Sequence, residues 1–198
     1  MSSNVFRYPF LQKNASSFAD DILLSKNKDE HRHHLISSVK GTGKSKFLEE
    51  LSTQLRTKAP NCWVQKIDLS ECRGKLEDVK NSGHLDVGEF VDVASSSMEA
   101  AEDELLQRIT LTQNGNQLNE NIKGKPWILL DSFDMVCPAY RQEVKRLLER
   151  LHEMGANLVV ATRPDEEHTV MEILPNDINV HRANSRKKAR MGACTTCF

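Results

Sequence analysis

The stretch "HLISSVKGTGKSKFLEELSTQL", from His34 to Leu55, decides the fold. It passes from a short apolar run through two glycines, a lysine and a serine into a segment with helical periodicity. Four apolar residues of that segment would share one face of a helix: Phe47, Leu48, Leu51 and Leu55. We therefore expect a strand over 35–38, a glycine turn, and a helix over 44–56.

The turn "SVKGTGKS" matches the P-loop pattern G-x-x-x-x-G-K-[ST], except that a serine replaces the first glycine. Glycines in such a loop let the backbone approach phosphate oxygens, and the N–H groups that begin the next helix attract the anion. Lys44 would then reach the β- and γ-phosphates of ATP or GTP, and the Ser45 hydroxyl would bind Mg²⁺. The predicted nucleotide-binding residues are Ser38, Val39, Lys40, Gly41, Thr42, Gly43, Lys44, Ser45 and Lys46.

The serine at position 38 bears on how well this loop works. Ser38 is expected to cost the loop some backbone freedom and so to weaken nucleotide binding. The alternative is a plain glycine turn with a capping serine, which leaves Lys44 unexplained. The position of the turn between a predicted strand and a predicted helix favours the P-loop.

Apolar runs of strand length alternate with amphipathic segments along the rest of the chain. Further strands are predicted over 62–69, 126–131 and 156–162, and further helices over 96–109, 138–154 and 164–174. The remainder of 70–125 is polar and poorly periodic, and "TQNGNQLNENIKGK" over 112–125 is expected to form a loop. This alternation predicts an α/β fold, a three-layer P-loop NTPase with a parallel β-sheet flanked by helices.

Two of the predicted strands end in residues that suit nucleotide chemistry. In "WILLDSFD", Asp131 directly follows a buried strand, where a P-loop requires a carboxylate for its Mg²⁺. Asp134 is placed either to activate the attacking water or to cap the next helix. In "LVVATRP", Arg163 either faces the γ-phosphate or is an exposed arginine at a strand end.

With these three segments, the chain resembles the NACHT family of STAND-class P-loop NTPases, within the wider AAA+-like group. The resemblance covers about residues 30–175, with "GTGKS" as Walker A, "WILLDSFD" as Walker B and "LVVATRP" as the sensor-1 strand. The small Ser132 and the second acid, Asp134, are similar to the D-[GAS]-h-D pattern of the family. The resemblance implies that Asp131, Asp134 and Arg163 are catalytic and that Ser45 and Asp131 bind Mg²⁺.

The resemblance also implies an ATP- or GTP-driven signalling switch whose nucleotide state controls self-association or a signalling protein partner. Met135 stands where family members usually carry an acid, so hydrolysis is expected to be slow. The resemblance stops near Leu174, where the family continues into a helical lid, a winged helix and a repeat-rich sensor. We therefore expect a slow nucleoside triphosphatase, with a catalytically inactive P-loop interaction module as the alternative.

Composition limits the other possibilities. A chain of 198 residues with 38% hydrophobic residues and a net charge of −1 is typical of one globular domain and indicates no polyelectrolyte partner such as nucleic acid. It contains no apolar segment of signal-peptide or membrane-spanning length, so we expect a cytoplasmic protein without membrane contact. The expected division is a helical extension over 1–30, the NTPase domain over 31–178 and a basic disordered tail over 179–198.

Two clusters of metal-ligand residue types carry little weight. His31, His33 and His34 lack accompanying cysteines or carboxylates at ligand spacing, and we expect a solvated turn there, with His34 opening a strand. Cys194 and Cys197 form a lone C-x-x-C pair in the predicted tail. Neither cluster predicts a metal site.

Overall fold

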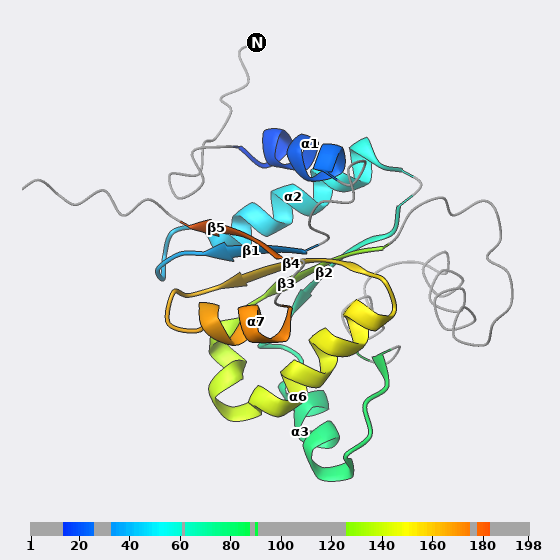
Figure 1. Ribbon diagram of the computed structural model, residues 1–198, viewed down its shortest axis with the longest axis vertical. Coiled ribbons are helices and arrows are strands. Elements are labelled where there is room, and N and C mark those ends of the chain that lie inside the picture. The colour runs from blue at the N-terminus through cyan, green and yellow to red at the C-terminus, as the bar shows by residue number, and fades with distance from the viewer. Residues whose placement is uncertain are drawn as a thin grey trace, which may run out of the picture.

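The computed structural model describes residues 14–25, 33–60, 62–87, 90, 126–174 and 178–182. Within them, five parallel strands form one sheet with helices on both faces, as predicted (Figure 1). In chain order the elements are α1 (Ala15–Ser25), β1 (His33–Ser37), α2 (Lys44–Lys58), β2 (Val64–Asp68), α3 (Arg73–Ser82), β3 (Trp127–Asp131), α6 (Phe133–Glu153), β4 (Asn157–Thr162), α7 (Glu167–Ile173) and β5 (Ile178–Arg182). None of the helices in the described ranges has the length and apolar character needed to cross a bilayer.

The strands lie in the order β2-β3-β4-β1-β5, and every neighbouring pair is parallel. β1, which leads into the glycine loop, lies between β4 and β5, and β4 separates it from β3. The register sets Ser37 beside Thr162 and Arg182. It also sets Asp68 beside Asp131. The last residues of the strands thus meet at one edge, the edge where open parallel sheets bind ligands.

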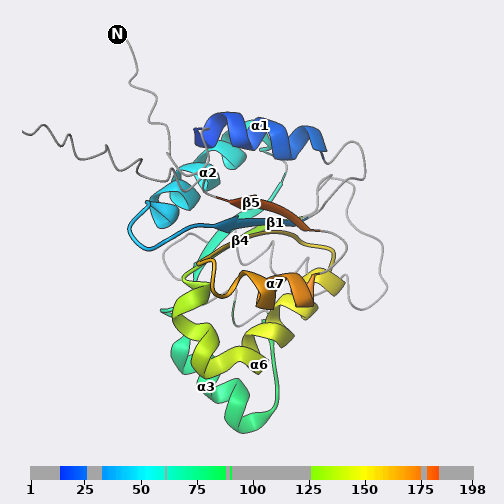
Figure 2. The same cartoon turned by 60° about the vertical axis from the view of Figure 1, so that its left-hand side comes forward.

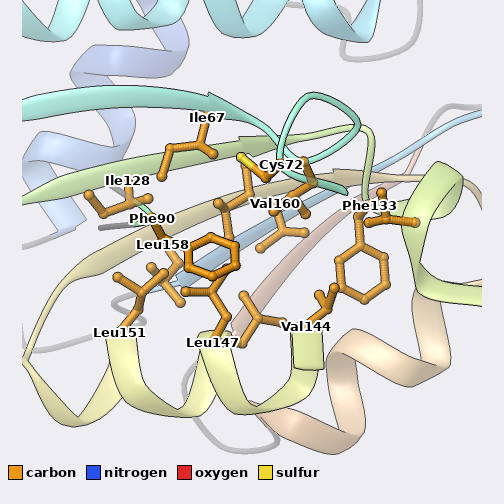
Figure 3. Close-up of a cluster of buried hydrophobic side chains, with 14 of the residues drawn as sticks. Ile67, Cys72, Phe90, Ile128, Phe133, Val144, Leu147, Leu151, Leu158 and Val160 are labelled. Atoms are coloured by element: carbon orange, nitrogen blue, oxygen red, sulfur yellow. The ribbon is translucent and has the colours of Figure 1, made fainter. Parts of the chain in front are cut away.

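Each face of the sheet has its own apolar core, because helices cover both sides. α1 and α2 lie over one face, and α3, α6 and α7 lie over the other (Figures 1 and 2). Trp127 and Leu129 of β3 belong to the core under α1 and α2. Ile128 and Leu130 belong to the other core, where Leu158 packs close to α6 (Figure 3). This alternation along a strand explains why "WILLD" is buried throughout and why its first four residues are apolar.

Helix α6 begins at Phe133 rather than at the predicted Pro138. Proline has no amide hydrogen and usually stands at the start of a helix, which is why the sequence predicts the later start. The segment before the proline is helical because Phe133 and Val136 are fully buried in the core. The helix then departs from regular geometry at Tyr140, with φ −129° and ψ 36°.

The sequence does not predict two of the elements. α3 lies in the polar segment that shows little periodicity and buries only Leu76 and Val79, so its apolar pattern is sparse. β5 is an edge strand without a fully buried residue, and its residues 179–182 were expected in the disordered tail. A smaller difference concerns α7, which begins at Glu167 because 164–166 form a turn.

Several predictions concern residues outside the described ranges. These are the helix over 96–109, residues 1–13 and 26–32 near the N-terminus, and residues 183–198 of the tail with its cysteine pair. Within the N-terminal extension, α1 buries Phe18 and Ile22 in the core that it shares with α2. The domain boundaries at residues 30 and 178 stay a prediction.

The histidines that begin β1 are buried, so the predicted solvated turn is wrong for His33. His33 and His34 are 0% and 1% exposed, and the strand begins at His33, one residue before His34, where it was expected to open. On the α6 side, His33 Nε2 lies 2.8 Å from His152 Nδ1. On the α1 side, His34 Nδ1 lies 3.3 Å from His181 Nε2 of β5. Each histidine of β1 therefore faces another histidine.

Candidate functional site

The loop between β1 and α2 takes its shape from two glycines. Gly41 and Gly43 have φ of 81° and 90°, in the left-handed region that favours glycine. A Cβ built on Gly41 would meet no atom within 4 Å, so the requirement there is conformational and not steric. Gly43 precedes α2 and provides no side-chain cap, so the first N–H groups of the helix remain available to an anion.

Ser38 does not strain this loop, contrary to expectation. Among the described residues, the only non-glycine residue with positive φ is Ser132, so Ser38 needs none of the freedom of glycine. Its buried hydroxyl lies 2.6 Å from Thr42 Oγ1, which donates to Val39 O at 2.9 Å. Since the Thr42 proton is used in that bond, Ser38 is the donor to Thr42. The serine therefore ties one end of the loop to the other.

Lys44 turns back over the loop from the first turn of α2. Its Nζ donates to Ser38 O at 2.9 Å and lies 3.4 Å from Val39 O. Burial lowers the pKa of Lys44 below its ordinary value, and Arg163 adds to this while Asp134 opposes it. The ammonium is therefore close enough to sense the charges that follow β3 and β4.

Asp131 ends β3 as a buried carboxylate with one open oxygen. Its Oδ1 accepts from Ser132 N at 2.9 Å. Its Oδ2 is buried without a hydrogen-bond partner in the described structure, and Lys66 Nζ lies 3.6 Å away. A buried, underused carboxylate oxygen suits a hard cation such as Mg²⁺, and the hydroxyl of Ser45, exposed at the start of α2, suits the same ion.

Asp134 and Arg163 form an ion pair between the start of α6 and the end of β4. Arg163 Nε lies 2.6 Å from Asp134 Oδ2, and the Asp134 side chain is 7% exposed. Arg163 Nη2 also lies 3.5 Å from the sulfur of Met135. Asp134 thus neutralises Arg163 and does not cap α6, whose N-cap residue is Ser132.

β4 also holds the start of the loop. Ser38 N donates to Thr162 O at 3.2 Å, which confirms that the "LVVATRP" strand lies next to the P-loop strand. The hydroxyl of Thr162 is fully buried and has no hydrogen-bond partner in the part of the chain that is described. It lies on the strand that separates the glycine loop from Asp131.

Sequence reasoning missed the contribution of β2. Asp68 Oδ1 accepts from Ser70 N at 2.9 Å and from Ser70 Oγ at 2.7 Å. Burial raises the pKa of Asp68, but hydrogen bonds from Ser70 and Ser132 outweigh it, so the pKa lies below its usual value. The signal was present, because "VQKID" ends in an aspartate just as "WILLD" does.

Comparisons with known proteins bear on the fold alone. No protein-family model matches the sequence, and no curated protein matches it significantly. Domain III of the replication initiation protein DnaA from Thermotoga maritima is similar in structure, with 14% identity, a TM-score of 0.50, and coverage of 92% of this chain and 68% of that chain. The chain therefore has the α/β three-layer fold of P-loop NTPases, as predicted.

Two further structures show weaker similarity. The Drosophila ORC bound to DNA has 10% identity, a TM-score of 0.49, and coverage of 84% of this chain and 28% of that chain. The Aeropyrum pernix ORC1 protein in complex with DNA has 16% identity, a TM-score of 0.44, and coverage of 84% and 44%. The chain thus spans less than half of either protein.

Proposed function

We propose that this chain binds ATP or GTP together with Mg²⁺ in the loop 38–46, hydrolyses it slowly, and acts as a nucleotide-controlled signalling switch. One observation carries the proposal. The fold sets the glycine loop and Lys44 at the edge of the sheet where Asp131, Asp134 and Arg163 also gather. A loop of N–H groups with a lysine and nearby carboxylates is the arrangement that binds a triphosphate and its metal.

Each part of the site has a separate task in this proposal. The first N–H groups of α2 would bind phosphate oxygens, and Lys44 would exchange the carbonyl of Ser38 for the β- and γ-phosphates. Ser45 and Asp131 would hold Mg²⁺, which supplies positive charge to the phosphates when bound. Burial of Asp131 Oδ2 without a hydrogen-bond partner supports this assignment.

Slow hydrolysis follows from the surroundings of Asp134. A carboxylate oxygen that pairs with Arg163 at 2.6 Å is not free to orient an attacking water until that arginine leaves. Arg163 would leave only when a γ-phosphate attracts it, which links release of Asp134 to a bound triphosphate. Met135 adds no second acid, because its thioether does not ionise, and its sulfur lies 3.5 Å from Arg163 Nη2.

The signalling part of the proposal is supported by the resemblance of the three motifs to the NACHT pattern. It implies a cytoplasmic protein whose nucleotide state controls self-association or a protein partner. The competing function is a P-loop interaction module that has the fold but performs no catalysis.

Calorimetric titration of ATP, ADP and GTP with and without Mg²⁺ tests the proposal. Lys44→Ala is expected to weaken Mg²⁺–ATP binding by roughly 30- to 100-fold, because charge-assisted hydrogen bonds to phosphate are lost. Lys145→Ala, which removes a half-exposed lysine of α6, is the matched control. Phosphate release that is lost in Asp131→Asn supports catalysis, whereas an unchanged dissociation constant in Lys44→Ala contradicts the nucleotide site. Nucleotide binding without phosphate release favours the interaction module.

A further inference from the structure

Lys66 of β2 lies against the carboxylate that ends the neighbouring strand. Its Nζ is 3.6 Å from Asp131 Oδ2, and its side chain is 28% exposed while that of Asp131 is 3% exposed. Lys66 precedes Asp68 by two residues and so shares a face of β2 with it. Its charge also lowers the pKa of Asp68, after the stronger effects of burial and serine hydrogen bonds. One ammonium therefore acts on both strand-end carboxylates.

Lys66 faces the same oxygen of Asp131 that would receive a metal. The other oxygen, Oδ1, already accepts the N–H of Ser132. At 3.6 Å, the contact with Lys66 is an attraction between charges and not a hydrogen bond, so Oδ2 keeps its lone pairs. A cation that approaches Oδ2 must therefore share it with a positive charge fixed on β2.

We propose that Lys66 lowers the affinity of this site for Mg²⁺. Its ammonium is a cation held by the chain, and it competes with the metal for Asp131. The inference deepens the proposed function, since it rests on Asp131 as the metal-facing carboxylate. A unit charge a few ångströms from a bound cation, in surroundings between water and protein interior, lowers metal affinity by roughly tenfold. Removal of the charge should therefore strengthen metal binding.

A purely structural role for Lys66 makes a different prediction. If Lys66 only neutralises a buried carboxylate, its removal lowers the stability of the protein and leaves metal affinity unchanged. Stability alone therefore does not distinguish the two roles. Metal affinity does, because only competition predicts that the variant binds the metal more tightly.

Binding of Mn²⁺ to the full chain, followed by electron paramagnetic resonance without nucleotide, tests the inference. Lys66→Gln removes the charge but keeps a donor for Asp131, and Lys66→Met is a second variant that keeps the apolar stem. Either is expected to bind Mn²⁺ about tenfold more tightly than the wild type. Lys66→Arg, which keeps the charge, and Lys145→Gln on α6 should stay within about twofold of the wild type.

Two further results complete the test. In an Asp131→Asn background, Lys66→Gln should no longer strengthen Mn²⁺ binding, and an equal gain there overturns the inference. Equal Mn²⁺ affinity of the wild type and both neutral variants also overturns it, whatever happens with nucleotide. If the Lys66 variants bind Mn²⁺ more tightly but the protein binds no ATP, the competition at Asp131 is supported and the nucleotide proposal is overturned.

Discussion

Ser38 and Thr42 close the glycine loop with a pair of hydroxyl groups that a glycine at position 38 would not provide. We predict that Ser38→Gly weakens Mg²⁺–ATP binding by several-fold, although it restores the usual P-loop pattern, because the loop loses the bond that ties its two ends. Thr42→Val should have a similar effect. The double variant should be little worse than either single one, with a coupling of about 1 kcal/mol. Calorimetric dissociation constants for the wild type, the two single variants and the double variant form a double-mutant cycle. Strictly additive losses of binding free energy would show that the pair does not organise the loop.

Arg163 provides the second residue-level prediction, because its partner Asp134 holds it close to Lys44. Arg163→Gln is expected to lower ATP affinity roughly tenfold while ADP affinity stays within about twofold, since only ATP offers a γ-phosphate. Competitive titration of the two nucleotides measures the ratio. Arg150→Gln, which removes a half-exposed arginine of α6, is the control. Equal weakening of ATP and ADP would contradict a role at the γ-phosphate.

The predictable part of the candidate site is the part that lies in continuous sequence. Gly43 and Lys44 follow from one loop pattern, and Asp131 follows from one buried run. Lys66 and Asp68 were missed because their importance depends on β2 lying next to β3, and no local pattern fixes the order of strands. The pairing of Arg163 with Asp134 likewise depends on β4 lying next to β3.

At the scale of elements, β5 is attached to α7 by an ion pair between Arg182 and Glu167, with Arg182 Nε 2.6 Å from Glu167 Oε1. Burial raises the pKa of Glu167, but the hydrogen bond and charge of Arg182 outweigh it, so the pKa lies below the usual value. A lowered carboxyl pKa stabilises the fold above the unfolded value of about 4.3, and this is lost as the pH falls through the lower folded value.

We therefore predict that Glu167→Gln lowers the melting temperature by roughly 2 to 4 °C at pH 7, and that the difference shrinks below about pH 4. Thermal unfolding of both proteins across this pH range measures it. Glu172→Gln, at an exposed position of α7, should change little at either pH. A difference that persists unchanged at low pH would show that the carboxylate charge is not responsible.

The sequence predicts those strands whose side chains are buried on both faces of the sheet and those helices whose buried residues recur at regular spacing. β3 and β4 are buried throughout because helices cover both faces, and α2 shows its buried face clearly. β5 and α3 have too few buried residues for a pattern to stand out. The early start of α6 was missed because packing of Phe133 outweighs the usual signal of Pro138.

At the scale of the whole molecule, one histidine pair joins β1 to α6, and a second joins β1 to β5 within the sheet. Leu158 N donates to His33 Nδ1 at 3.3 Å, so His33 carries its proton on Nε2 and donates to His152. His33 is fully buried, so loss of its partner would remove a hydrogen bond from a group that water does not reach.

We predict that His152→Ala lowers the melting temperature by roughly 2 to 4 °C, because His33 Nε2 loses its hydrogen-bond acceptor in a buried place. Thermal unfolding of both proteins at pH 7 measures the difference. His168→Ala, at an exposed position of α7, is the control. Equal melting temperatures of the wild type and His152→Ala would show that the pair does not stabilise the fold.

The strand order has a consequence for folding during synthesis on the ribosome. β1 precedes both of its neighbours by more than 100 residues, since His33 pairs with Leu158 on one side and Ile178 on the other. Contacts between segments so far apart in the chain form late and slowly. During synthesis, the glycine loop therefore leaves the ribosome long before the strands that will hold it. A translation product that stops before Asn157 would contain every residue of the phosphate-binding loop but neither of the strands that pair with β1.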